Sequence, residues 1–260
     1  MERNILIVVE GRRTEANFFS QLFSVFGEKF DIYCLGTNIY SLYKAMKAID
    51  FNGDIKDILS EIHPEQKDIL SKKFAYTYLV FDCDVQHTKK VDYRDIKDIV
   101  FENFDKLKEM SLYFDNETDP SIGKLYINYP MMESYRDCND FFDEEFTNAE
   151  VELQEISNYK KLVASKKLHS LHIDKFSRND FEMLILQNLY KLALIHKDIW
   201  EKPKYNDYLE IADTSTTLKK EIQFAKEIEK IKVLNTSLFA ITDFYGNKNN
   251  FYDKLILNNN

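Results

Sequence analysis

Four short apolar runs, separated by stretches with helical periodicity, constrain the fold of this chain most. The first run, residues 5–9, reads ILIVV. A continuous run of this kind is typical of a strand that is buried on both faces. The other three lie at residues 30–35, 76–81 and 125–128. Strands that alternate with helices in this way predict an α/β fold, with a parallel-rich sheet flanked by helices on both faces.

The helical stretches divide the chain into two regions. Between the strands, helices are expected at about residues 14–26, 40–49 and 93–110, with a further helix up to residue 70 that is broken near Asn52-Gly53 and Pro64. After about residue 136 the pattern is almost wholly helical, at about residues 147–167, 179–198, 215–232 and 235–245. We therefore expect an α/β catalytic core over residues 1–136. A mostly helical C-terminal region over residues 137–260 would bind substrate or a partner.

Composition excludes several classes of protein. The 260 residues are 44% hydrophobic and include only 6 Gly and 4 Pro, which suits a globular chain with a real core. No apolar run approaches the ~20 residues of a membrane helix, and no secretory signal is visible. The three cysteines form no CxxC pair, so a cytoplasmic location is expected. A net charge of −9 argues against a basic nucleic-acid coat protein. It leaves open an enzyme that contacts nucleic acid through metal ions.

Acidic residues follow three of the predicted strands. Glu10 follows the first strand, Asp82 and Asp84 end the third, and Glu133 comes after the fourth. Ligands of open parallel sheets bind outside the carboxyl ends of the strands, so these side chains would converge in one cleft. Clustered carboxylates need a divalent cation, and hard oxygen ligands suit Mg²⁺ or Mn²⁺. The alternative is that each acid is an ordinary solvated residue at a strand exit.

The DxD motif alone does not select one chemistry. Asp82 and Asp84 are alternate residues of an extended segment, so both carboxylates can reach one metal ion. A strand that ends in DxD occurs in haloacid-dehalogenase-type phosphatases, where the first Asp is a nucleophile, in glycosyltransferases and in Toprim nucleases. The phosphatase pattern favours Gly and Thr directly afterwards, whereas Val85-Gln86-His87 follows here.

Two further segments resemble one family. Residues 9–19 read VEGRRTEANFF, which resembles the first Toprim motif and the opening of RloB-like Toprim defence proteins. Residues 128–135 read NYPMMESY and resemble the N-x-P-x-x-E-x-aromatic element of the same group. The resemblance covers roughly residues 4–136. The sequence departs from the family after its DxD, where Val85 and Gln86 replace polar or acidic residues, and no basic residue beside the metals can be placed.

The resemblance implies a nuclease that cleaves phosphodiester bonds of DNA or of RNA such as tRNA in bacterial anti-phage defence. RloB-like proteins include the nuclease-like member of the AbiL abortive-infection system, and OLD-type relatives act with ATPases. An ABC- or AAA-type ATPase partner is therefore expected, and a homo-oligomer is left open. Two rivals use the same acids: a metal-dependent phosphatase, and a non-catalytic sensor or binding subunit.

The implied site has these roles. Asp82 and Asp84 would hold the metal ion, Glu10 would be a ligand or a general acid/base, and Glu133 would complete a second metal position. Glu15 is an additional ligand or an acid that favours the helix dipole. The remaining candidates contact phosphate or substrate: Gly11 through a tight turn, Arg12 and Arg13 unless they are merely solvated, and His87. Lys160, Lys161, Lys166 and Lys167 are clustered, and a solvated helix face is their expected role.

Overall fold

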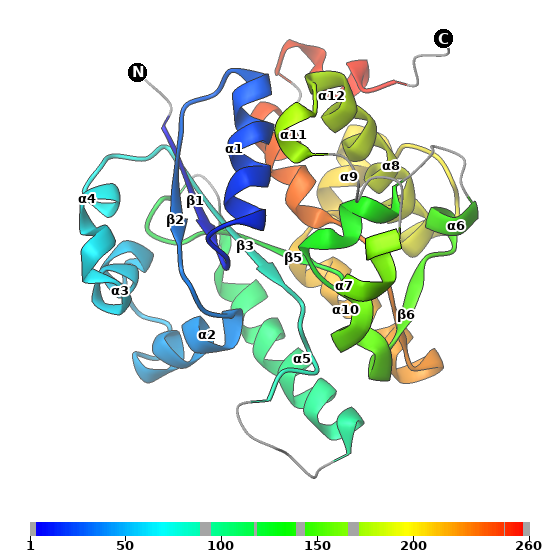
Figure 1. Ribbon diagram of the computed structural model, residues 1–260, viewed down its shortest axis with the longest axis horizontal. Coiled ribbons are helices and arrows are strands. Elements are labelled where there is room, and N and C mark those ends of the chain that lie inside the picture. Colours follow the sequence, from blue (N-terminus) through cyan, green and yellow to red (C-terminus); the bar gives the residue numbers. More distant parts are fainter. Residues whose placement is uncertain are drawn as a thin grey trace.

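A mostly parallel sheet of five strands forms the centre of the N-terminal part (Figure 1). The computed structural model describes residues 4–88, 95–116, 119–138, 144–165, 172–246 and 248–256. The strands are β1 (Ile5–Val9), β2 (Phe30–Cys34), β3 (Tyr76–Asp82), β4 (Asp115–Asn116) and β5 (Gly123–Asn128), in the order β2-β1-β3-β5-β4. All pair in parallel except the two-residue β4, which is antiparallel to β5. The expected α/β class is confirmed.

The helices of this part lie close to the predicted ranges. They are α1 (Thr14–Phe26), α2 (Ile39–Ala48), α3 (Ile55–Ile62), α4 (Lys67–Leu70) and α5 (Ile96–Tyr113). The apolar residues of α1 recur every three or four positions, so five of them are buried on one face: Phe18, Phe19, Leu22, Phe23 and Phe26. Gly27, with φ 75°, ends this helix in the left-handed conformation that glycine adopts freely. The predicted breaks near Gly53 and Pro64 are also confirmed.

The C-terminal part is less helical than predicted. Its elements are α6 (Glu144–Thr147), β6 (Glu150–Glu152), α7 (Tyr159–Leu162), α8 (Arg178–Lys197), α9 (Tyr205–Ile211), α10 (Thr214–Ile228), β7 (Lys230–Lys232), α11 (Phe239–Tyr245) and α12 (Phe251–Lys254). The helix predicted at 147–167 is wrong, because residues 150–152 pair antiparallel with β7 and residues 153–158 form a 3-10 helix. Residues 166 and 167 of that prediction lie outside the described residues. The helix predicted at 215–232 ends at Ile228, because Glu229 turns the chain with φ 57°.

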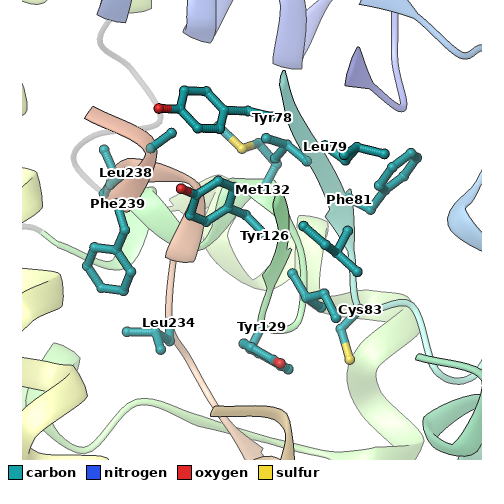
Figure 2. Packing of buried hydrophobic residues seen from close by; sticks show 14 of the residues in the cluster. Tyr78, Leu79, Phe81, Cys83, Tyr126, Tyr129, Met132, Leu234, Leu238 and Phe239 are labelled. Carbon is teal, nitrogen blue, oxygen red and sulfur yellow. The ribbon is translucent and has the colours of Figure 1, made fainter. Parts of the chain in front are cut away.

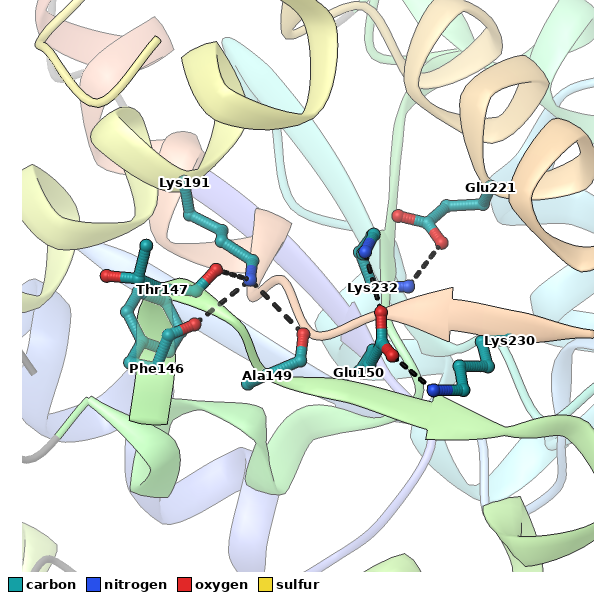
Figure 3. Close-up of polar contacts among 8 residues, drawn as sticks. All are labelled: Phe146, Thr147, Ala149, Glu150, Lys191, Glu221, Lys230 and Lys232. Carbon is teal, nitrogen blue, oxygen red and sulfur yellow. Dashed lines mark hydrogen bonds and ion pairs between the residues drawn. The ribbon is translucent and has the colours of Figure 1, made fainter. Parts of the chain in front are cut away.

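A buried lysine fixes the segment that leads to β6 (Figure 3). Lys191 of α8 is 1% exposed, and its ammonium donates to the carbonyls of Phe146, Thr147 and Ala149 at 3.0, 2.6 and 3.2 Å. Burial, followed by the nearby Lys232, lowers the pKa of Lys191 to about 8. The three carbonyl acceptors satisfy all three of its N–H groups. Lys191 therefore fixes the backbone of residues 146–149, at the start of the range where the sequence predicted a helix.

The C-terminal segment at residues 234–239 packs against β3 and β5 (Figure 2). Leu234, Leu238 and Phe239 share a buried cluster with Tyr78 and Tyr126 of the sheet. One hydrophobic core therefore includes residues on both sides of residue 136. In the described part of the chain, no helix is long and apolar enough to cross a membrane.

Candidate active site

Glu10 and Asp82 lie at the carboxyl ends of neighbouring strands. Glu10 follows β1 directly, and Asp82 is the last residue of β3, which pairs in parallel with β1. Burial raises the pKa of Glu10 to about 8, with further contributions from the carboxylates of Asp84 and Glu15. Among the described residues, the buried Oε2 of Glu10 has no hydrogen-bond partner. Glu10 therefore lies at the sheet edge where the sequence predicts acids, within electrostatic reach of Asp84 and Glu15.

Asp82 is held by the backbone of the segment that follows β5. Its side chain is buried, and its Oδ1 accepts the Met132 N–H at 2.7 Å. Burial and then the carboxylates of Glu10 and Glu133 raise the pKa of Asp82 well above its usual range, although the Met132 N–H lowers it. A carboxylate that is fixed in this way points in a defined direction within the cluster.

Glu15 joins the cluster from the first turn of α1. It is 9% exposed, and its pKa is raised by burial and by the carboxylate of Glu133. A Cβ on Gly11 would lie only 2.3 Å from Oε2 of Glu15. A larger residue at position 11 would therefore force the Glu15 carboxylate to move away from this backbone.

Asp84 contributes its charge from an unusual backbone conformation. With φ 42° it lies in the left-handed region, which Asp tolerates better than most residues. Its Oδ1 accepts from Nε2 of Gln86 at 2.8 Å, and its carboxylate is the strongest of the charges that raise the pKa of Glu10. The prediction that Asp82 and Asp84 lie on one extended segment is therefore wrong, because the strand ends at Asp82 and the chain turns at Asp84.

Glu133 brings a lysine into the cluster. It is 5% exposed, and its Oε1 lies 3.2 Å from Nζ of Lys160, whose side chain is 58% exposed. Removal of water lowers the pKa of Lys160, but the carboxylates of Glu133, Asp82 and Glu15 raise it above its ordinary value. The sequence predicted that Lys160 lies on a solvated helix face. In the structure its side chain is partly exposed, but its ammonium faces the acids. Lys166 and Lys167 lie outside the described residues.

The two arginines lie between Glu10 and Glu15 in the chain. Arg12 and Arg13 are exposed where the chain enters α1, and Arg12 lies 4.0 Å from the Glu65 carboxylate. Such a long, exposed ion pair contributes little to stability, so it leaves the guanidinium available to other anions.

His87 is oriented by its neighbours. Its Nε2 lies 2.9 Å from Nδ2 of Asn38, and its ring stacks on Tyr40 with an interplanar angle of 4°. The Asn38 oxygen caps α2 by accepting from the Ser41 N–H, so the Asn38 amide nitrogen faces His87. Nε2 of His87 therefore accepts, and the ring proton lies on Nδ1. The described contacts of this ring are to Asn38 and Tyr40 rather than to the acids.

The donor set of the cluster fits a hard divalent cation. All the candidate ligands are carboxylates, and the Oε2 atoms of Glu10 and Glu133 are buried without a partner among the described residues. The mutual repulsion that raises the pKa values would be relieved by a cation. Where the structure describes the chain, however, no three His, Cys, Asp or Glu side chains stand close enough to hold a metal ion as they lie. Binding would require the other carboxylates to turn toward Asp82, which the Met132 N–H holds in place.

Comparisons with protein-family models, with curated proteins and with solved structures find no match to this chain.

Proposed function

We propose that this chain is a divalent-metal-dependent nuclease that hydrolyses phosphodiester bonds in DNA or RNA. The observation that carries the proposal is the burial of mutually repelling carboxylates at one edge of the sheet, beside Lys160. Burying acids together costs stability, and such clusters are concentrated at functional sites. The carboxylates suit a cation, and the lysine beside them suits a phosphate diester.

Each acid has a separate role in this proposal. Glu10, Asp82, Asp84 and Glu133 would hold Mg²⁺ or Mn²⁺, with Glu15 as an additional ligand. The bound cation would polarise a phosphoryl oxygen and lower the pKa of the attacking water. If Glu10 does not bind the cation, it would act as a general acid/base instead, because its pKa of about 8 in the metal-free protein lets it hold and release a proton near neutral pH.

The cations of the site supply phosphate contacts. Lys160 lies against Glu133, where its ammonium can also meet a phosphate oxygen of the substrate. Arg12 and Arg13 are exposed near the start of α1 and can bind a flanking phosphate bidentately. Gly11 lets the backbone turn tightly there, and Nδ1–H of His87 is a donor available to substrate.

The biological setting of the proposal rests on the motif resemblance at residues 9–19 and 128–135. In this setting the chain would act in anti-phage defence in a bacterial cytoplasm, with an ABC- or AAA-type ATPase as its partner. The partner matters to any assay, because a nuclease of this kind can depend on it for activation.

Lys160 offers a test of the proposed site with a matched control. Cleavage of mixed DNA and RNA substrates with Mn²⁺ should fall at least tenfold in Lys160→Met. The neighbouring exposed lysine of the same short helix provides the control Lys161→Met, which should cleave like the wild type. Equal activity in all three proteins would remove Lys160 from the mechanism.

A non-catalytic sensor subunit is the second candidate, and one observation favours it. The described carboxylates do not form a three-ligand set as they stand. A folded wild type that binds no Mn²⁺ and cleaves nothing, with or without an encoded ATPase neighbour, would support the sensor.

A metal-dependent phosphatase is less well supported, because its nucleophile would be the buried Asp82, one oxygen of which already accepts the Met132 N–H. Turnover of a simple aryl phosphate would revive this candidate.

A further inference from the structure

A fully buried asparagine of the C-terminal part lies one hydrogen bond from the segment that carries Glu133. Asn235 precedes α11 and is 0% exposed. Its Nδ2 donates to the Met132 carbonyl at 2.8 Å. Its backbone N–H donates to Oδ1 of Asn188, also at 2.8 Å. Both the amide group and the backbone of Asn235 are thus committed to specific partners.

Met132 connects Asn235 to the acids. The Met132 N–H donates to Oδ1 of Asp82 at 2.7 Å, and the Met132 carbonyl accepts from Asn235. Glu133 is the next residue along the chain. The two peptide groups that flank Met132 are therefore each held at one end, one by Asp82 and the other by Asn235.

Other side chains hold Asn235 itself. Oγ of Ser237 donates to Oδ1 of Asn235 at 2.5 Å, and the Ser237 N–H donates to Oδ1 of Asn128 at 3.1 Å. On α8, Nδ2 of Asn188 donates to the Leu184 carbonyl at 2.9 Å. A buried network in which every amide has a partner is rigid, because each lost bond would leave an unpaired polar group.

We infer that Asn235 is a positioning residue for the acid cluster: through Met132 it sets the direction of Asp82 and the place of Glu133. The inference rests on the proposed function for its consequence in catalysis. Its geometric content, the link from Asn235 to Asp82, can be tested separately. It gives the C-terminal part a role as the support of the site, in addition to the substrate or partner binding expected of it.

The test compares the wild type, Asn235→Ala and a control that also loses one buried hydrogen bond. Thr217→Val is the control, because the Thr217 hydroxyl donates to the Ile211 carbonyl, and both residues belong to the α9–α10 region. The first readout is amide hydrogen exchange at Met132 relative to Leu79 of β3, which corrects for global opening. We expect Asn235→Ala to speed the relative exchange of Met132 at least tenfold, and Thr217→Val to leave it unchanged. A smaller change in Asn235→Ala would overturn the inference.

The second readout is Mn²⁺ binding and the separation of kcat from KM in cleavage. Removal of a group that orients metal ligands typically costs 10–100-fold in metal affinity or activity. Asn235→Ala should therefore lose at least tenfold in Mn²⁺ affinity and in kcat, with KM within threefold, whereas Thr217→Val should match the wild type. Unchanged affinity and kcat in a folded Asn235→Ala would overturn the catalytic consequence.

Two further outcomes remain distinguishable. If the wild type neither binds Mn²⁺ nor cleaves, the proposed function fails, and the exchange at Met132 alone decides whether Asn235 positions Asp82. If Asn235→Ala does not fold, Ser237→Ala takes its place, since it removes only a hydroxyl, which donates to Asn235 and lies 3.5 Å from Sδ of Met132. Its relative exchange at Met132 should rise at least threefold, and a smaller rise would count against the inference.

Discussion

Replacement of Glu10 by its neutral isostere should stabilise the metal-free protein, and increasingly so as the pH rises. In the folded protein, burial and neighbouring carboxylates raise the pKa of Glu10 from 4.5 to about 8. The unfolded chain therefore loses this proton near pH 4.5, whereas the folded protein keeps it up to about pH 8. Stability rises with pH only where the unfolded state binds more protons, so this group makes the wild type less stable between these two pH values.

The size of the effect follows from the same pKa values. At about 1.4 kcal/mol per pH unit, the raised pKa of Glu10 lowers the unfolding free energy of the wild type by about 3 kcal/mol at pH 7 and by about 5 kcal/mol above pH 8. Glu10→Gln carries no such cost, because glutamine does not titrate. The difference in unfolding free energy between the two proteins should be below about 1 kcal/mol at pH 5 and should then grow in favour of Glu10→Gln.

Urea unfolding followed by circular dichroism measures this difference at pH 5, 7 and 8.5, with EDTA present throughout. The control is Glu61→Gln, which removes an exposed carboxylate of α3 and should follow the wild type at every pH. A Glu10→Gln advantage that is the same at all three pH values, or a loss of stability at pH 8.5, would refute the reasoning about the buried acids.

Two other predictions follow from the described contacts. Lys191→Met should lower the unfolding free energy by about 2–4 kcal/mol, because three backbone carbonyls lose a charged donor. Urea titration measures this loss, with the exposed Lys161→Met as the control. A loss below about 0.5 kcal/mol would contradict the prediction. Mn²⁺ binding at pH 7 should release at least the proton of Glu10, since Glu10 must ionise to become a ligand. Calorimetry in two buffers of different ionisation enthalpy detects the release, which should be smaller in Glu10→Gln, and binding without proton release would contradict it.

The strands and the acids at their ends could be predicted from the sequence for local reasons. The strand β1 pairs with a strand on each side and is buried at every position, so all of residues 5–9 are apolar. This continuous apolar run is visible in the sequence without knowledge of the partners. Glu10 and Asp82 then follow from the strand ends, since parallel strands end at the same edge.

Contacts between distant parts of the chain could not be predicted in this way. The strand at residues 150–152 depends on pairing with residues 230–232, and its own short sequence carries no signal of that partner. The contact of Lys160 with Glu133 joins the two ends of a segment that contains β6 and a 3-10 helix, where local periodicity predicted one continuous helix. Asn235 is the first of three consecutive polar residues, Asn235-Thr236-Ser237, and only the buried network shows what it contacts.

Metal-dependent cleavage by the wild type and by Asp82→Asn tests the central claim most directly. The assay uses single- and double-stranded DNA and RNA with Mg²⁺ or Mn²⁺, with and without an encoded ATPase neighbour. Asp57→Asn is the matched control, because Asp57 is exposed on α3. The account predicts cleavage by the wild type and Asp57→Asn that EDTA abolishes, and a loss of at least 100-fold in Asp82→Asn. Cleavage that survives in Asp82→Asn, or a folded wild type that cleaves none of these substrates, would contradict it.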